Sequence, residues 1–277
     1  MIGALAAEWL KVRRNIYIWL TVLLILVVLA GRDYGLNWYL FNRPKPVLPP
    51  GLTLAGLQEV LYPIGLARVA AANGNGITAA LEFIIGVLIV GTEYSWGTLR
   101  TVLTVGPGRL ETFTAKALSL ALVTGIATLS RYLVAAGCST LLATLSHQGI
   151  VWPPPTEIAA SLPAAWLIAL CYASFGACLA FIFRRSAIAY GIGLTYLFVI
   201  EDRVVGILGQ AGGPLLSQVW KLFPGPNATA LAASFGSAQA SGGQQLVDAE
   251  RAVFTLAAYT AVALSVSALL LLRRDVT

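Results

Sequence analysis

The sequence predicts an all-α membrane protein that crosses the bilayer several times. Only 11% of its 277 residues are charged and 58% are hydrophobic, and the mean hydropathy is +0.80. Soluble proteins carry about 25% charged residues, so this chain has too few charges to cover a soluble surface. Apolar runs also recur along the chain at the length of about 20 helical residues that a hydrocarbon core requires.

Residues 1–14 are predicted to form an interfacial helix. Apolar Leu5, Trp9 and Val12 recur at helical spacing, which favours an amphipathic helix on the inner membrane surface. The charged residues between and after them are Glu8, Lys11, Arg13 and Arg14. The alternative is that this stretch is only the charged flank of the first span.

Six membrane spans within a single transmembrane domain, residues 1–277, are expected at 16–30, 77–91, 117–145, 163–183, 187–209 and 252–272. A long polar interval separates the first two, and its less polar part, Leu54–Ala72, is predicted to be an outer-surface or re-entrant helix. The loop before the fourth span contains Trp152 followed by three prolines. A Gly-, Pro-, Ser- and Gln-rich interval, Gly212–Ala249, precedes the last span.

Pairs of arginines at span ends predict the orientation. Basic residues concentrate on the cytoplasmic side of membrane proteins, and an inside N-terminus places three such pairs there: Arg13–Arg14, Arg184–Arg185 and Arg273–Arg274. The sequence therefore predicts a multi-pass protein of the cell membrane with both termini in the cytoplasm. The net charge of +6 serves this topology, so we expect no nucleic-acid partner.

The motifs of common enzymes are missing. There is no phosphate-binding loop with its lysine, no metalloprotease or hydrolase signature, and one histidine, His147, which falls in a loop. Cys138, Cys171 and Cys178 all lie in apolar runs, where buried small side chains explain them better than disulfides or metal ligands. We predict no catalytic residue, no metal site and no cofactor bound by this chain.

Ionisable residues inside spans are few, and each is therefore a candidate for function. Glu82 lies about 13 Å from the inner boundary and Arg131 about 22 Å along the third span. These depths allow the two to form an intramembrane ion pair or to line a translocation path. Glu201 and Asp202, near the outer end of the fifth span, are either interfacial residues or the lining of an outward gate.

The segment 93–116 between the second and third spans is short, basic and bounded by turn residues. Gly97 permits a reversal, and Gly106-Pro-Gly ends the short helical turn predicted over Thr101–Val105. A short helix between two hinges can transmit force into both adjoining spans. An ordinary cytoplasmic loop is the alternative.

The string Glu93-Tyr-x-x-Gly97-Thr98-Leu99-Arg100-x-x-Leu103, followed by Pro107-x-Arg109 and Lys116, resembles the signature of permease subunits of ATP-binding-cassette (ABC) transporters of the type-2 exporter family. The stretch Glu8-x-x-Lys11-x-Arg13-Arg14 and the stretch Leu222-Phe-Pro-x-Pro-Asn227 also resemble that family. The six-span layout extends the resemblance over the whole chain. Gly108 stands where the family usually has a more polar residue.

The resemblance implies a permease that works with separate partners. Two cytoplasmic ABC ATPase subunits would bind ATP and Mg²⁺ and contact a coupling helix within 93–116, through residues such as Glu93, Gly97, Thr98, Arg100, Arg109 and Lys116. The interfacial helix, with Glu8, Lys11, Arg13 and Arg14, would touch the ATPase as well. A second permease chain, identical or a sister, would complete the path, and short outer re-entrant helices before the last span would close it.

Two other classes of membrane protein are alternatives to an ABC permease. An ion-coupled secondary transporter would use Glu82 and Arg131 as its relay, although such folds usually show internal repeats and none is visible. A scaffold or sensor subunit without transport would need neither residue beyond assembly. The apolar spans and outer aromatics suit a hydrophobic or amphipathic cargo, such as a drug, lipid or peptide. The family resemblance implies that this cargo is exported from the cytoplasm or inner leaflet.

Overall fold

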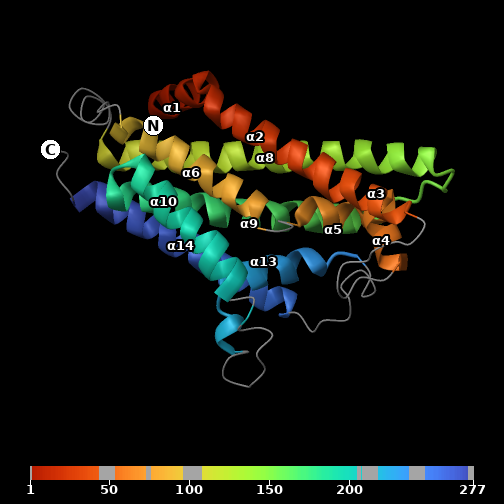
Figure 1. The fold of residues 1–277 in the computed structure, drawn as a ribbon. Helices are drawn as coiled ribbons and strands as arrows, with labels where there is room; N and C mark the ends of the chain where they lie inside the picture. Colours follow the sequence, from red (N-terminus) through yellow and green to blue (C-terminus); the bar gives the residue numbers. More distant parts are fainter. Residues whose placement is uncertain are drawn as a thin grey trace.

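The structure, a computed structural model, describes residues 2–43, 54–72, 76–95, 108–204, 207, 218–236 and 247–273. Throughout these ranges the regular structure is helical (Figure 1). Five helical stretches are long and apolar enough to cross a membrane, which confirms the predicted class of a helical membrane protein. They are the continuous stretch Ile16–Phe41, α6 (Ile77–Ser95), α8 (Arg109–Leu145), α9 (Pro155–Phe183) and α14 (Ala249–Arg273).

Helices α6 and α9 form the centre of the bundle. In their most apolar windows, 72% of the residues of α6 and 67% of those of α9 are buried, against 28% in Ile16–Phe41 and in α14. Glycines allow the two central backbones to meet, because a Cβ on Gly86 would collide with the Ala173 carbonyl and one on Gly176 with the Phe83 carbonyl. The peripheral helices thus leave broad apolar faces for lipid.

The first and fourth long helices begin or end where the sequence did not predict. The first continues from α2 (Ile16–Val28) through the π-helix η1 (Leu29–Leu36) and α3 (Asn37–Phe41), whereas the predicted end was Ala30. The π-helical turns absorb Gly31 and Gly35 without breaking the helix, and they bury Tyr34. Helix α9 starts at Pro155, where the missing amide is harmless, so Pro163 lies inside the helix instead of opening it.

The predicted fifth span is the least regular of the six. It consists of α10 (Ser186–Thr195) and the π-helix η3 (Tyr196–Val204), and its apolar part ends at Glu201. A helix over Ser186–Glu201 is about 24 Å long at the α-helical rise, less than a hydrocarbon core of about 30 Å. The described residues therefore contain five helical stretches that are long and apolar enough to cross a membrane, and the six-span layout stays a prediction.

Short helices join the long ones at the end of the bundle away from the N-terminus. They are α4 (Leu54–Leu61), the 3₁₀ turn η2 (Pro63–Gly65), α5 (Leu66–Ala71) and α13 (Pro224–Ala233). Leu66, Ala67 and Ala70 of α5 are buried, and α5 packs against α8 and α9. The stretch Leu54–Ala72 is thus helical as α4–η2–α5, and α5 enters the bundle; its predicted place on the outer side stays a prediction.

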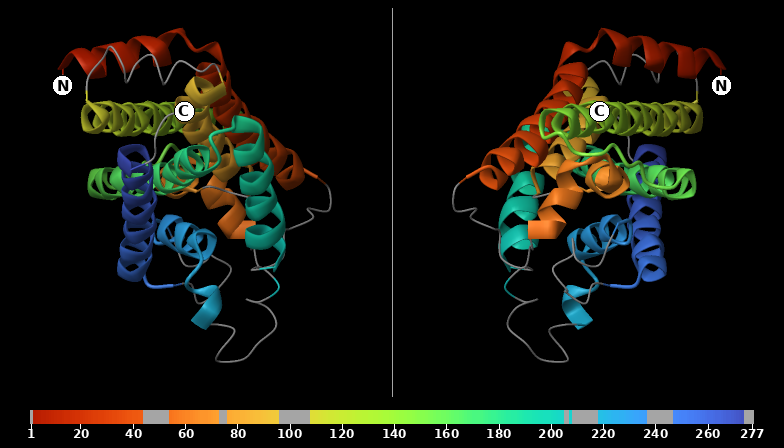
Figure 2. Two further views of the ribbon diagram at one scale, coloured as in Figure 1. Left: turned by 90° about the vertical axis from the view of Figure 1, so that its left-hand side faces the viewer. Right: turned by 90° about the vertical axis from the view of Figure 1, so that its right-hand side faces the viewer.

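Helix α1 (Ile2–Arg14) runs across the long helices rather than along them (Figures 1 and 2). It lies at the end of the bundle where α6 ends, α8 begins and α14 ends (Figure 1). The predicted coupling turn Thr101–Val105, together with Gly97, Thr98 and Arg100, lies outside the described residues.

Candidate functional site

Four charged side chains form a closed ring where α1 meets α6 and α8. Lys116 Nζ lies 3.1 Å from Glu8 Oε2 and 2.7 Å from Glu93 Oε2. Lys11 Nζ lies 2.8 Å from Glu8 Oε1 and 2.7 Å from Glu93 Oε1. Each ammonium group therefore bridges both carboxylates, and charges of opposite sign alternate around the ring.

Local structure explains how these four residues meet. Glu8 and Lys11 are three residues apart in α1, so they share one helix face. Glu93 stands in the last turn of α6, and Lys116 lies two turns into α8. The ring thus joins α1 to both helices that border residues 96–107.

Burial makes the ring a strong constraint. The side chains of Lys116, Glu8 and Glu93 are only 3%, 6% and 7% exposed, whereas that of Lys11 is 43% exposed. Burial alone would lower the pKa of Lys11, but its hydrogen bonds with Glu8 and Glu93 outweigh burial, and the pKa rises above its usual value. Buried charges are stable only when paired and hydrogen-bonded, so these helices are held in one relative position.

Three further predicted contact residues that the structure describes, Arg13, Arg14 and Arg109, are not members of the ring. The Arg109 Nη1 donates a hydrogen bond to the carbonyl of Leu272 at 3.0 Å, which ties the start of α8 to the end of α14. Arg13 and Arg14 are exposed at the end of α1. The start of α8 and the ends of α1, α6 and α14 therefore share one end of the molecule.

Glu82 and Arg131 form a second charged site, inside the bundle. Arg131 Nη1 lies 3.1 Å from Glu82 Oε1, and each residue is 1% exposed. Arg131 Nη2 also donates to the Ala72 carbonyl just after α5. The predicted pairing is thus present in the structure, and it links α8, α6 and the segment that contains α5.

Glu201 lies in a third place, beside an apolar cavity. Its carboxylate accepts a hydrogen bond from the Gly225 amide at the start of α13 and one of 3.5 Å from the Tyr172 hydroxyl. The adjoining cavity has a volume of about 250 Å³ between α9, η3, α13 and α14. The side chain of Asp202, predicted to act beside Glu201, lies outside the described part of the chain.

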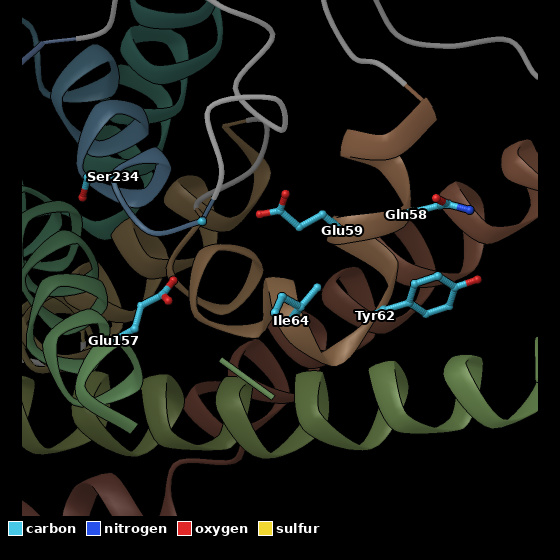
Figure 3. A pocket seen from close by; sticks show the side chains of 7 residues that line it. Gln58, Glu59, Tyr62, Ile64, Glu157 and Ser234 are labelled. Carbon is cyan, nitrogen blue, oxygen red and sulfur yellow. The ribbon is translucent and has the colours of Figure 1, made fainter. Parts of the chain in front are cut away.

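A larger pocket of about 550 Å³ opens between α4, η2, the start of α9 and the end of α13 (Figure 3). Glu59 and Glu157 lie on opposite sides of it. Within the described residues, Glu157 Oε1 is buried and accepts no hydrogen bond. The sequence predicted neither this pocket nor the cavity beside Glu201, because both are built by residues that are far apart in the chain.

The three cysteines are free thiols, as predicted, and Cys171 and Cys178 are buried. Comparison of the sequence with known family models and with curated proteins finds no match. The geometry described above must therefore carry any functional conclusion.

Proposed function

We propose that this chain is the membrane-spanning permease subunit of an ABC exporter, driven by separate cytoplasmic ATPase subunits. The ring of Glu8, Lys11, Glu93 and Lys116 is the observation that carries the proposal. A permease of this kind must receive movement between its second and third spans and pass it to the rest of the bundle. The ring supports that role because it fastens both of those spans to α1.

The contacts between helices support a route by which movement at residues 93–116 would pass into the bundle. A push on the segment between Glu93 and Lys116 moves the ends of α6 and α8, and the ring makes α1 move with them. Because α6 packs tightly on α9, the displacement continues into the centre of the bundle. In this proposal the end that carries α1 faces the cytoplasm, consistent with its basic residues.

The Glu82–Arg131 pair favours a structural role over an ion relay. Both groups are almost completely buried, and Arg131 is also engaged by the Ala72 carbonyl. A relay residue must lose and regain its proton or ion during each cycle, which this closed arrangement opposes. The pair therefore supports an ATP-driven permease over an ion-coupled transporter.

Co-purification with a partner tests the proposal. The chain is expressed together with an ATPase that is encoded by a neighbouring gene and that carries a phosphate-binding loop and an ABC signature. We expect a complex that hydrolyses ATP, and we expect Arg100→Ala and Glu93→Ala to reduce both complex formation and ATP hydrolysis. Arg251→Ala is the matched control, because Arg251 is exposed at the opposite end of α14.

Two results would contradict the proposal. Absence of any such ATPase, or of a complex with it, removes the driving partner and favours a scaffold or an ion-coupled carrier. If a complex forms but Arg100→Ala and Glu93→Ala match Arg251→Ala in assembly and ATP hydrolysis, the coupling assignment for residues 93–116 is wrong.

A further inference from the structure

The cavity between α9, η3, α13 and α14 combines aromatic walls with a buried carboxylate. Four of its lining residues are aromatic: Tyr172, Phe175, Tyr196 and Tyr259. The other lining residues are small or aliphatic or carry thiols, namely Cys171, Cys178, Pro224, Val262, Ala263 and Val266. No lysine or arginine lines this cavity among the described residues.

Glu201 lies directly behind one wall of this cavity. Its two hydrogen-bond donors, the Tyr172 hydroxyl and the Gly225 amide, belong to or adjoin that wall. Tyr196, which belongs to the same π-helix η3 as Glu201, also lines the cavity. The carboxylate therefore lies at the edge of the cavity.

The charge of Glu201 is incompletely balanced by the protein. The residue is 9% exposed, its hydrogen-bond donors are neutral, and it forms no ion pair within the described residues. A carboxylate in apolar surroundings is stabilised by an opposite charge, and such residues in membrane proteins mark ligand paths. A cation held in the cavity would supply that charge.

The aromatic rings favour the same ligand. Ring faces attract a cation within about 6 Å of their centroids, and they do so more strongly where water is excluded. The Tyr172 hydroxyl lies 3.5 Å from the Glu201 carboxylate, so this aromatic wall adjoins the proposed counter-charge. The volume of about 250 Å³ is below the roughly 300–1,000 Å³ of drug-sized sites, so it fits one ring or one ammonium headgroup.

We propose that this cavity binds the cationic headgroup of a lipophilic organic amine or quaternary ammonium compound, with Glu201 as its counter-charge. Binding itself requires only this chain. That the ligand is also the exported cargo rests on the proposed function above.

Equilibrium binding of benzyltrimethylammonium to the full chain in lipid nanodiscs tests the proposal. The control ligand is neopentylbenzene, in which carbon replaces nitrogen and the charge is lost at nearly constant shape. We expect the cation to bind at least tenfold more tightly than the neutral compound. Glu201→Gln should remove that preference, because it removes the negative charge. The glutamine side-chain oxygen can still accept the hydrogen bond from the Gly225 amide, so the local structure is kept.

Two further variants make the result specific. Ala263→Phe fills the cavity from α14 while Glu201 stays in the chain, and it should abolish binding of the cation. Glu157→Gln removes a carboxylate that lies outside this cavity and should leave binding unchanged. Circular dichroism of each variant confirms that it is folded.

The proposal is overturned if the folded wild-type chain does not bind the cation or binds both compounds equally. It is also overturned if Glu201→Gln or Ala263→Phe binds the cation as wild type does. Occupation of the cavity by a lipid acyl chain would produce the first of these results. Cation binding without any ATPase partner would contradict only the exporter proposal, and an ATPase complex without cation binding would contradict only this one.

Discussion

Lys116 Nζ and Glu93 Oε2 are 2.7 Å apart, so the start of α8 is bonded directly to the end of α6. The two residues are 23 positions apart in the sequence and mark the two ends of the segment 93–116 predicted between the second and third spans. Their contact closes the loop between those spans at its base. Glu8 and Lys11 extend the contact to α1, which turns a local loop closure into a joint between three helices.

The two lysines of this joint are expected to differ in importance. Lys116→Met removes the buried ammonium that bridges the Glu8 and Glu93 carboxylates, and removal of one member of a buried ion pair costs about 3–5 kcal/mol. Lys11→Met removes a half-exposed partner, for which solvent screening limits the loss to about 1 kcal/mol. Thermal unfolding of the detergent-solubilised variants, followed by tryptophan fluorescence, measures the difference.

A charge-neutral pair provides the control for this comparison. Lys116→Met combined with Glu93→Gln should recover part of the stability lost by Lys116→Met, because one uncompensated carboxylate is removed. Equal melting temperatures for Lys11→Met and Lys116→Met would show that burial does not determine the strength of the joint.

The Glu82–Arg131 pair leads to a second prediction. Arg131→Met should destabilise more than Glu82→Gln, because Arg131 binds the Ala72 carbonyl in addition to Glu82. We expect a loss of about 3–5 kcal/mol for Arg131→Met. The same thermal unfolding measurement ranks the two variants.

Exchanging the charges separates pairing from other effects. The double variant Glu82→Arg with Arg131→Glu should be more stable than either single exchange, yet less stable than wild type, since a glutamate at position 131 cannot donate to Ala72. A double variant no better than the singles would disprove the structural pairing.

Features that follow from local patterns were predictable from the sequence. Hydrophobic runs predicted the five long helical stretches that the described residues contain. The similar depths of Glu82 and Arg131 indicated their ion pair, which the structure contains. The end of the first helix was missed because the polar stretch Gly31–Phe41 stays helical through π-turns, and hydropathy does not detect such turns. The sequence predicts a helix boundary at Pro163, although the helix already begins eight residues earlier.

Features that depend on side chains meeting across the bundle were not predictable. Glu8 belongs to the predicted N-terminal helix and Glu93 to the segment after the second span. Nothing in the spacing of these residues indicates that Lys11 and Lys116 bridge them. The cavity beside Glu201 needs residues from α9, η3, α13 and α14 at once. Packing of this kind is set by helix crossing geometry, which one sequence leaves open.

The close contact between α6 and α9 gives the last prediction, since only a hydrogen atom fits at Gly86 and Gly176. Gly86→Ala and Gly176→Ala should each push the two backbones apart and destabilise the protein by about 1–3 kcal/mol or more. Gly137→Ala in α8 is the matched control, because nothing lies within 4 Å of a Cβ there; alanine's higher helix propensity should leave it as stable as wild type or more so, by up to about 1 kcal/mol. Melting temperatures in one detergent compare the three variants. If all three melt together, the α6–α9 contact is not the tight centre that holds the bundle.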